Sequence, residues 1–135
     1  MGLIIDTNVL VHAERSRSLV NFKQWEEHGD AFISAITCSE LLVGVHKADT
    51  VERRIKRAAF VEGLLEALPV LVFDKDVARV HAQLMATFPK GKTVGAHDLI
   101  IGATAIKHGF PVLTANVDEF SMMPGLTVLF CELGK

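Results

Sequence analysis

The chain has 135 residues, of which 50% are hydrophobic and 22% are charged. This length is near the commonest domain size, so we expect one compact domain over residues 1–135, and the apolar content excludes a disordered chain. The formal net charge of -2 does not by itself indicate a polyanionic partner. Basic residues are nevertheless concentrated in two stretches, which hold Arg15, Arg17 and Lys23, and then Arg53, Arg54, Lys56 and Arg57.

Cysteine content and hydropathy indicate the cellular setting. Cys38 and Cys131 are too few for a disulfide scaffold and match no paired metal-ligand spacing, which favours a reducing compartment. No apolar run approaches the roughly 20 residues that span a bilayer, and the N-terminus lacks the basic segment and cleavage site of a signal peptide. Asp6 also stands where a myristoylation pattern needs Ser or Thr. We expect a soluble, cytoplasmic protein with no membrane contact.

The first half of the chain alternates short apolar runs with helical patterns. The all-apolar run at residues 3–5 is typical of a strand buried on both faces, and we expect it to be the central strand. The turn residues Gly29 and Asp30 precede the next strand. In chain order, the predictions are a strand at 3–5, a helix from 7 to 12, a helix at 18–28, a strand at 31–34 and a helix ending near 47.

The second half continues the same alternation. Pro69 ends a long charged helix, and Asp74 or Asp76 is suited to cap the helix that follows the next strand. The predictions are a helix at 51–68, a strand at 70–73, a helix to 87, an exposed loop at 88–95, a helix at 96–108, and strands at 112–114 and 127–130. Such alternation favours the α/β class, as a single-domain α/β/α sandwich around a mostly parallel sheet.

Acidic side chains stand where predicted strands or loops lead into helices. Asp6 follows the first strand, whereas Glu40 and Asp98 lie near helix starts. Ligands of open parallel sheets bind beyond the carboxyl ends of the strands, so we expect these three carboxylates to meet there. Two carboxylates about 4 Å apart repel by roughly 4 kcal/mol at an effective dielectric near 20. The trio therefore requires protons or a divalent cation, which indicates metal-dependent phosphodiester chemistry.

Each carboxylate taken alone also has a structural explanation. Asp6 could cap the first helix, and Thr37-x-x-Glu40 matches a capping box worth about 1 kcal/mol to a helix. Asp98 is favoured in a first helical turn by the macrodipole. The catalytic interpretation rests on the coincidence of the three at one edge of one sheet.

The residue types discriminate between kinds of metal and of catalysis. Carboxylates match Mg2+ or Mn2+, whereas zinc usually recruits His or Cys, and the six histidines form no paired zinc motif. His97, beside Asp98, is the single histidine that we keep as a supporting candidate. A P-loop and a Gly-x-Ser-x-Gly nucleophile elbow are both absent from the sequence.

The ordered set of motifs resembles the PIN-domain family, specifically the VapC-type toxins of toxin–antitoxin pairs. The resemblance implies an endoribonuclease dependent on Mg2+ or Mn2+, often a homodimer, neutralised by a small antitoxin whose tail enters the active-site groove. The matching pieces are Leu3-Ile4-Ile5-Asp6-Thr7-Asn8, Ile33-Ser34-x3-Ser39-Glu40-Leu41-x2-Gly44, Thr93-Val94-Gly95-Ala96-His97-Asp98-x3-Gly102-Ala103-x-Ala105 and Leu113-Thr114-x-Asn116-x2-Glu119-Phe120.

Carried over by position, the resemblance implies that Asp6, Glu40 and Asp98 are the acidic, metal-binding set, supported by Asn8 and Thr114. Some family members have a fourth acid where this chain has Asn116, so either Asp118 or Glu119 would have to compensate.

In our preferred scheme, one ion binds tightly and a second arrives with RNA. Asp6 and Asp98 hold the tight ion, while Glu40 orients or deprotonates the attacking water. From the basic stretches, we expect Arg15, Arg53 or Arg54 to contact RNA phosphates. A solvated helix face explains the same arginines equally well.

Two other readings stay open at this level. An aspartyl-phosphate receiver or phosphatase would use Asp6 as nucleophile, although a second Asp two residues on and a late catalytic Lys are not evident. A non-catalytic PIN-like module would use an apolar surface, including Leu42, Val43 and Phe60, for assembly alone.

Overall fold

The structure is a computed structural model that describes residues 1–16, 22–88 and 94–133. Arg17, residues 18–21 of the second predicted helix and residues 89–93 of the predicted loop lie outside these ranges. No helix in the described part of the chain combines the length and hydropathy that crossing a bilayer requires.

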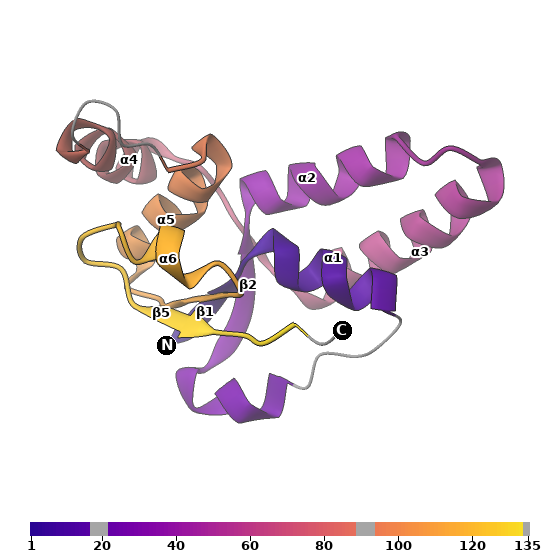
Figure 1. Ribbon diagram of the computed structural model, residues 1–135, viewed down its shortest axis with the longest axis horizontal. Coiled ribbons are helices and arrows are strands. Elements are labelled where there is room, and N and C mark those ends of the chain that lie inside the picture. Colours follow the sequence, from indigo (N-terminus) through magenta and orange to yellow (C-terminus); the bar gives the residue numbers. More distant parts are fainter. Residues whose placement is uncertain (17–21, 89–93, 134–135) are drawn as a thin grey trace.

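The described residues form a five-stranded sheet in the order β3-β2-β1-β4-β5, with every neighbouring pair parallel. The predicted central position of the first strand is confirmed, because β1 lies between β2 and β4 (Figure 1). Crossover connections between parallel strands require intervening helices, as the alternating pattern predicted. The strands are β1 (Gly2–Ile5), β2 (Asp30–Ser34), β3 (Val70–Leu71), β4 (Val112–Thr114) and β5 (Val128–Phe130).

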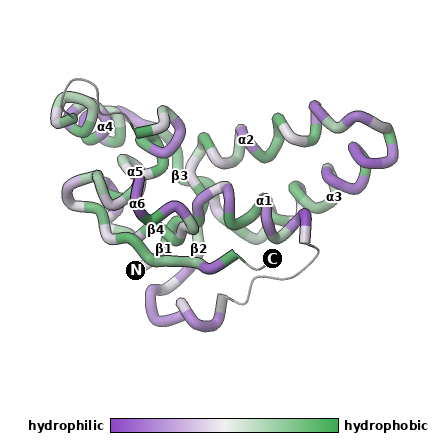
Figure 2. Tube along the Cα trace, viewed as in Figure 1, coloured by the Kyte–Doolittle hydropathy of each residue, from purple (hydrophilic) through white to green (hydrophobic). Residues whose placement is uncertain are grey.

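Helices cover both faces of this sheet. Successive residues of β1 point to opposite faces, so Ile4 joins one core, while Leu3 and Ile5 join the other. The helices are α1 (Thr7–Ser16), α2 (Ala35–His46), α3 (Val51–Ala67), α4 (Lys75–Thr87), α5 (Ala96–His108) and α6 (Val117–Phe120). Residues of α4, α5 and α6 pack in the core of Ile4, whereas those of α1, α2 and α3 pack in that of Leu3 and Ile5. The predicted α/β/α sandwich is confirmed, and Figure 2 shows its hydrophilic turn between α2 and α3.

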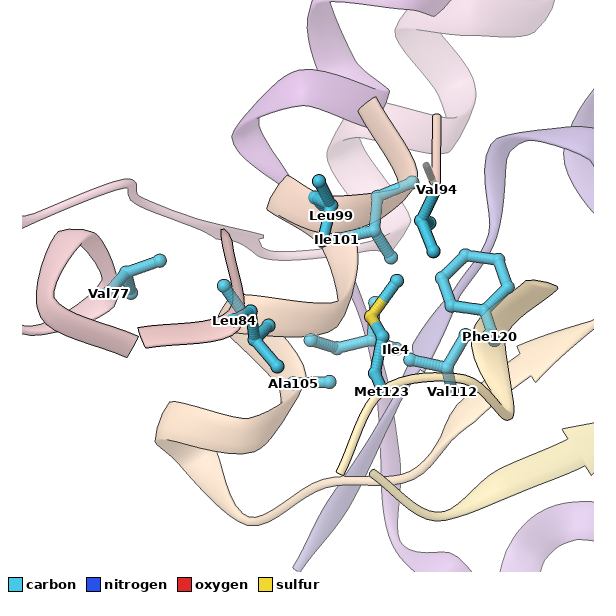
Figure 3. Close-up of a cluster of buried hydrophobic side chains, with 11 residues drawn as sticks. Ile4, Val77, Leu84, Val94, Leu99, Ile101, Ala105, Val112, Phe120 and Met123 are labelled. Atoms are coloured by element: carbon cyan, nitrogen blue, oxygen red, sulfur yellow. The ribbon is translucent and has the colours of Figure 1, made fainter. Parts of the chain in front are cut away.

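A close contact fixes α5 against the segment that follows α6. A Cβ placed on Gly102 would meet the Met123 Sδ at 2.2 Å, so any larger residue at this point of α5 would force the Met123 side chain to move. Phe120 is fully buried beside it, and Figure 3 shows Phe120 and Met123 within the cluster that contains Ile4 and Val112. The single turn of α6 is thereby held between α5 and the sheet.

Several elements differ from the predictions by more than a residue at their ends. The first helix continues to Ser16 rather than residue 12, and Val94, at the end of the predicted exposed loop, is 5% exposed and packs in the core of Ile4. The third strand ends at Leu71 rather than residue 73, because Val72 and Phe73 lie beyond the edge strand and are 63% and 43% exposed. The described end of the second predicted helix is a 3-10 helix over Phe22–His28. The short helix α6 was not predicted.

The capping box at Thr37 and Glu40 was a wrong prediction. The α2 helix begins three residues earlier, where the Ser34 hydroxyl accepts a hydrogen bond from the Thr37 backbone amide at 3.2 Å. Glu40 therefore lies in the second turn of α2, and its side chain does not cap the helix. In α4, by contrast, Asp74 is the N-cap and accepts from the Val77 amide at 2.9 Å, as predicted.

Candidate active site at the carboxyl edge of the sheet

The structure brings the three predicted carboxylates into one electrostatic group. Asp6 directly follows β1 and is only 2% exposed, whereas Glu40 and Asp98 approach it from α2 and from the first turn of α5. The charges of Asp6 and Glu40 both act on Asp98, and that of Glu40 acts on Asp6. The three carboxylates therefore lie close enough to interact electrostatically, at the edge where β1 and β4 end.

Asp6 is held by the strand beside it. The Thr114 hydroxyl, at the end of β4, donates a hydrogen bond of 2.7 Å to Asp6 Oδ2. Burial raises the pKa of Asp6, and the charge of Glu40 adds to this, while bonds from Thr114 and from the backbone amides of Thr7 and Asn8 lower it. The carboxylate is thus oriented by donors but not neutralised by any cation among the described residues.

Asp98 is the most perturbed acid of the group. Burial, the charges of Asp6 and Glu119 and a hydrogen bond with Glu119 raise its pKa to about 7. The pKa of Glu119 is lowered instead, because the Gly95 amide donates a hydrogen bond to Oε1 and the Asn116 Nδ2 donates one to Oε2 at 2.7 Å. Without a cation, Asp98 is therefore protonated below about pH 7, and in that form it donates to the ionised Glu119.

Glu40 is positioned by one donor on each oxygen. Thr7 Oγ1 lies 2.8 Å from Glu40 Oε1, and His97 Nδ1 lies 3.2 Å from Oε2. Thr7 Oγ1 also lies 2.9 Å from Thr37 Oγ1, which is fully buried. Because a carboxylate can only accept, the Thr7 proton is directed to Glu40. His97, kept as a supporting candidate from its sequence position, therefore contacts the site.

The supporting residues divide into those at the site and one outside it. The Asn116 backbone amide donates to Thr114 Oγ1 at 2.8 Å, so Thr114 links the loop to Asp6. Asn8 is exposed at the mouth. Asp118 is exposed on α6 and makes none of the contacts described above, whereas Glu119 faces Asp98. Of the two acids considered as replacements for an acid at position 116, Glu119 is the one that lies beside Asp98.

A groove of about 270 Å³ leads away from Glu40 between α1, α2 and α3. Its lining includes Val43, Phe60 and Arg15. Of the other predicted RNA contacts, Arg53 binds both oxygens of Asp49 at 2.9 Å, and Arg54 Nη2 lies 3.5 Å from the Ala48 carbonyl. Both belong to α3, and Arg53 adjoins a second basic hollow beside Arg15.

Sequence reasoning missed an ion pair in the groove wall. Arg57 Nε donates to Glu14 Oε1 at 3.0 Å, and its Nη1 donates to the Gly44 carbonyl at 3.0 Å. These bonds tie α3 to α1 and α2. No local signal reveals them, since Glu14 and Arg57 are 43 residues apart.

The chemistry of the donor set fits a hard divalent cation. All four acids are carboxylates, the ligand type that Mg2+ and Mn2+ prefer, and their mutual repulsion is what such an ion relieves. Among the described residues, however, no three His, Cys, Asp or Glu side chains already have the spacing that holds an ion. Asp98 and Glu119 are instead bonded to each other, so cation binding has to displace a proton from Asp98.

The raised pKa of Asp98 predicts pH-dependent stability. Between about pH 4 and pH 7 the folded chain retains a proton that the unfolded chain has lost, so the free energy of unfolding falls as pH rises through this window. Asp98→Asn keeps a donor to Glu119 at every pH. With EDTA present, this variant should melt about 3 to 6 °C above wild type near pH 8, on the order of 1 kcal/mol after solvent screening, and hardly above it near pH 5.

Thermal denaturation followed by circular dichroism measures this difference. Asp118→Asn, which removes an exposed carboxylate from α6, should leave the melting temperature unchanged at both pH values. An Asp98→Asn effect of equal size at both pH values would contradict the assignment of the shared proton.

Comparison with known proteins places this chain in a family. The family model of the PIN domain matches residues 3–126. "Ribonuclease VapC1" of Rickettsia felis is 41% identical over 130 residues, which cover 96% of each chain. "Ribonuclease VapC" of Rickettsia bellii is 35% identical over 134 residues, and 98% of each chain is covered. A "tRNA(fMet)-specific endonuclease VapC" of Salmonella typhimurium is 37% identical over 97 residues, covering 71% of each.

Solved structures agree with the sequence comparison. VapBC2 from Rickettsia felis, bound to promoter DNA, superimposes with a TM-score of 0.86 over 98% of this chain and 100% of the other, and at 24% identity it shows the shared fold. DNA-bound VapBC from Salmonella typhimurium gives a TM-score of 0.83 at 29% identity over 96% and 98% of the two chains. The acid group at the end of β1 thus lies in a chain that belongs to the PIN-domain family, among the VapC ribonucleases.

Proposed function

We propose that this chain is a metal-dependent endoribonuclease and the toxin of a toxin–antitoxin pair. The observation that carries the proposal is the convergence of Asp6, Glu40, Asp98 and Glu119 at one sheet edge in a chain of this family. A buried carboxylate such as Asp6 is costly to retain without a role that uses its charge. Its 2% exposure also argues against the alternative in which Asp6 attacks a phosphoryl group directly.

Asp6, Asp98 and Glu119 would hold Mg2+ or Mn2+, and Glu40 would stand beside them. When bound, such an ion offsets the negative charge that develops on the phosphate in the transition state. Glu119 then supplies the fourth carboxylate that Asn116 does not, while Asn116 keeps Glu119 in place through its 2.7 Å bond.

Glu40 is the residue suited to move a proton. Its two oxygens are steered by Thr7 and His97, so it can orient water and accept a proton as the water oxygen attacks phosphorus. The bond from phosphorus to the 3′-oxygen breaks, and that oxygen takes up a proton from solvent. The products are a 5′-phosphate and a 3′-hydroxyl.

Removing single carboxylates should abolish cleavage without unfolding the chain. Asp6→Asn and Asp98→Asn are each expected to lower the rate by at least about 100-fold, because each removes a charge that the transition state needs but keeps the shape of the side chain. The rate of cleavage of a fluorescent RNA with Mg2+ measures this. The matched control is Asp118→Asn, which should cleave at the wild-type rate. Full activity of Asp98→Asn would overturn the mechanism.

The hydroxyl that orients Asp6 should govern metal affinity. Thr114→Val keeps the side-chain volume but removes the 2.7 Å bond to Asp6, so Mn2+ should bind about 10- to 100-fold more weakly by titration calorimetry. Thr104→Val is the control, since the equally buried Thr104 hydroxyl donates only to the Ile100 carbonyl of its own helix. Equal loss of affinity in both variants would indicate a general packing defect.

The groove between α1, α2 and α3 is the expected site of the antitoxin tail. Its apolar walls include Leu41, Val43 and Phe60, and Glu40 supplies negative charge for a basic peptide residue. Val43 and Phe60 are also residues of the assembly surface considered for a non-catalytic module, so a peptide-binding role accounts for them without excluding catalysis.

A charge placed on this wall should weaken antitoxin binding. Val43→Glu, at a position 45% exposed, is expected to raise the Kd at least about 10-fold, because the new carboxylate loses hydration when a peptide covers it. Surface plasmon resonance with the cognate antitoxin measures the change. Val51→Glu, at a position 70% exposed in the first turn of α3, serves as control. Weakening by Val51→Glu alone would place the antitoxin elsewhere.

A homodimer and a cytoplasmic location complete the proposal. The exposed apolar side chains of Val72, Phe73 and Met85, around β3 and α4, are candidates for the subunit contact. A monomeric mass by light scattering would refute the dimer, and recovery in a membrane fraction would refute the location.

A further inference from the structure

Two hollows flank α1, and they share Asn8, Val11 and Arg15 in their walls. The first is the groove toward α2 and α3 described above. The second, of about 360 Å³, lies on the other side, between α1 and the segments that contain Asn116 and Leu133. We infer that the RNA strand reaches the acid group through this second hollow, with Arg15 binding a phosphate at its far end. The inference rests on the proposed ribonuclease function.

The lining of the second hollow suits a polyanion. Asn8, His12, Arg15 and Asn116 present polar or basic side chains, and no acid is found among its described lining residues. The groove on the other side of α1 contains Glu40, which none of its described basic lining residues pairs with, and Glu14, which is paired with Arg57. A chain of phosphates is therefore repelled less in the second hollow, while its apolar residues Val11 and Leu133 can contact bases.

Arg15 is the cation whose charge is available there. It is exposed in the last turn of α1, and no residue in the described ranges pairs with it. The nearby cations of α3 are already partnered, since Arg53 binds Asp49 at 2.9 Å and Lys56 binds Glu52 at 3.4 Å. A phosphate at Arg15 displaces no ion pair. Between Arg15 and Arg53, two of the arginines expected from the sequence to contact RNA, the absence of an ion pair favours Arg15.

The hollow joins the acid group at its other end. Asn116 lines the hollow and also binds Glu119, and its amide binds the Thr114 hydroxyl that orients Asp6. From Asn8 to Arg15 the helix rises by about 10 Å, or roughly three stacked nucleotides at about 3.4 Å each. The acid end and the Arg15 end can therefore contact phosphates of one short strand.

The salt dependence of RNA binding tests the role of Arg15. In the Asp98→Asn background, which prevents cleavage, anisotropy of a short fluorescent single-stranded RNA is measured over a range of salt concentrations. Arg15→Gln should lower the slope of log Kd against log salt by about 0.7, the value for one phosphate on a single strand. Arg53→Gln, the matched loss of an arginine from α3, should leave the slope unchanged. The reverse result would overturn the inference.

Photo-crosslinking tests which side of α1 the strand occupies. A benzophenone amino acid at His12 faces the second hollow, whereas the same group at Val43 faces the first groove. RNA should crosslink to the His12 variant at least about tenfold more than to the Val43 variant. Preferential crosslinking at Val43 would overturn the assignment and place RNA where the antitoxin is expected.

The failure of this inference can be told apart from the failure of the proposed function. If the wild-type protein cleaves RNA but the variants give the contrary result in either test, the assignment of RNA to the second hollow fails while the ribonuclease proposal stands. If the wild-type protein neither binds nor cleaves RNA, both fail.

Discussion

Repulsion among carboxylates confined to one sheet edge is the constraint around which this protein is organised. Asp6 is buried beside Glu40 and Asp98, and the burial of Asp98, together with the charges of Asp6 and Glu119, raises the pKa of Asp98 to about 7. Asp6, Glu40 and Glu119 each receive a neutral donor, among them the Thr114 hydroxyl, the Thr7 hydroxyl and the Gly95 amide. Hydrogen bonds of this kind orient a carboxylate without cancelling its charge. The fold therefore retains negative charge at this edge that its hydrogen bonds do not neutralise.

The precision of the site depends on packing that lies behind it. The α6 helix is a single turn, too short to be stable by itself, and it is held because Phe120 is completely buried. Glu119 is the preceding residue, so burial of Phe120 sets where its carboxylate lies. The close approach of Gly102 to Met123 brings α5 against the same segment, and with it Asp98. Apolar contacts thus place the carboxyl groups of Asp98 and Glu119 next to each other.

Much of this arrangement could be predicted from the sequence, for identifiable reasons. The helix at 96–108 and the strand at 112–114 have their predicted bounds because Gly109, at φ 71°, ends one before the other begins. The carboxyl-edge rule was enough to bring Asp6, Glu40 and Asp98 together. An apolar run does not tell an edge strand from a buried one, so residues 72–73 were misassigned. Ser34 and Thr37 both suit a helix cap, and the pattern favoured the wrong one. The position of the Glu119 carboxylate could not be predicted from the sequence, because it depends on how α6 packs against α5 and the sheet.

The order of the sheet also affects when the acid group can exist. The first strand made by the ribosome is the middle one, and its neighbour β4 comes 108 residues later at the Thr114 contact to Asp6. Pairings of such long sequence separation form late in folding. A nascent or truncated chain that stops before β4 and α6 lacks the donors and the fourth carboxylate, so it cannot assemble the site. The acid group described here is thereby complete only when translation of the domain is almost finished.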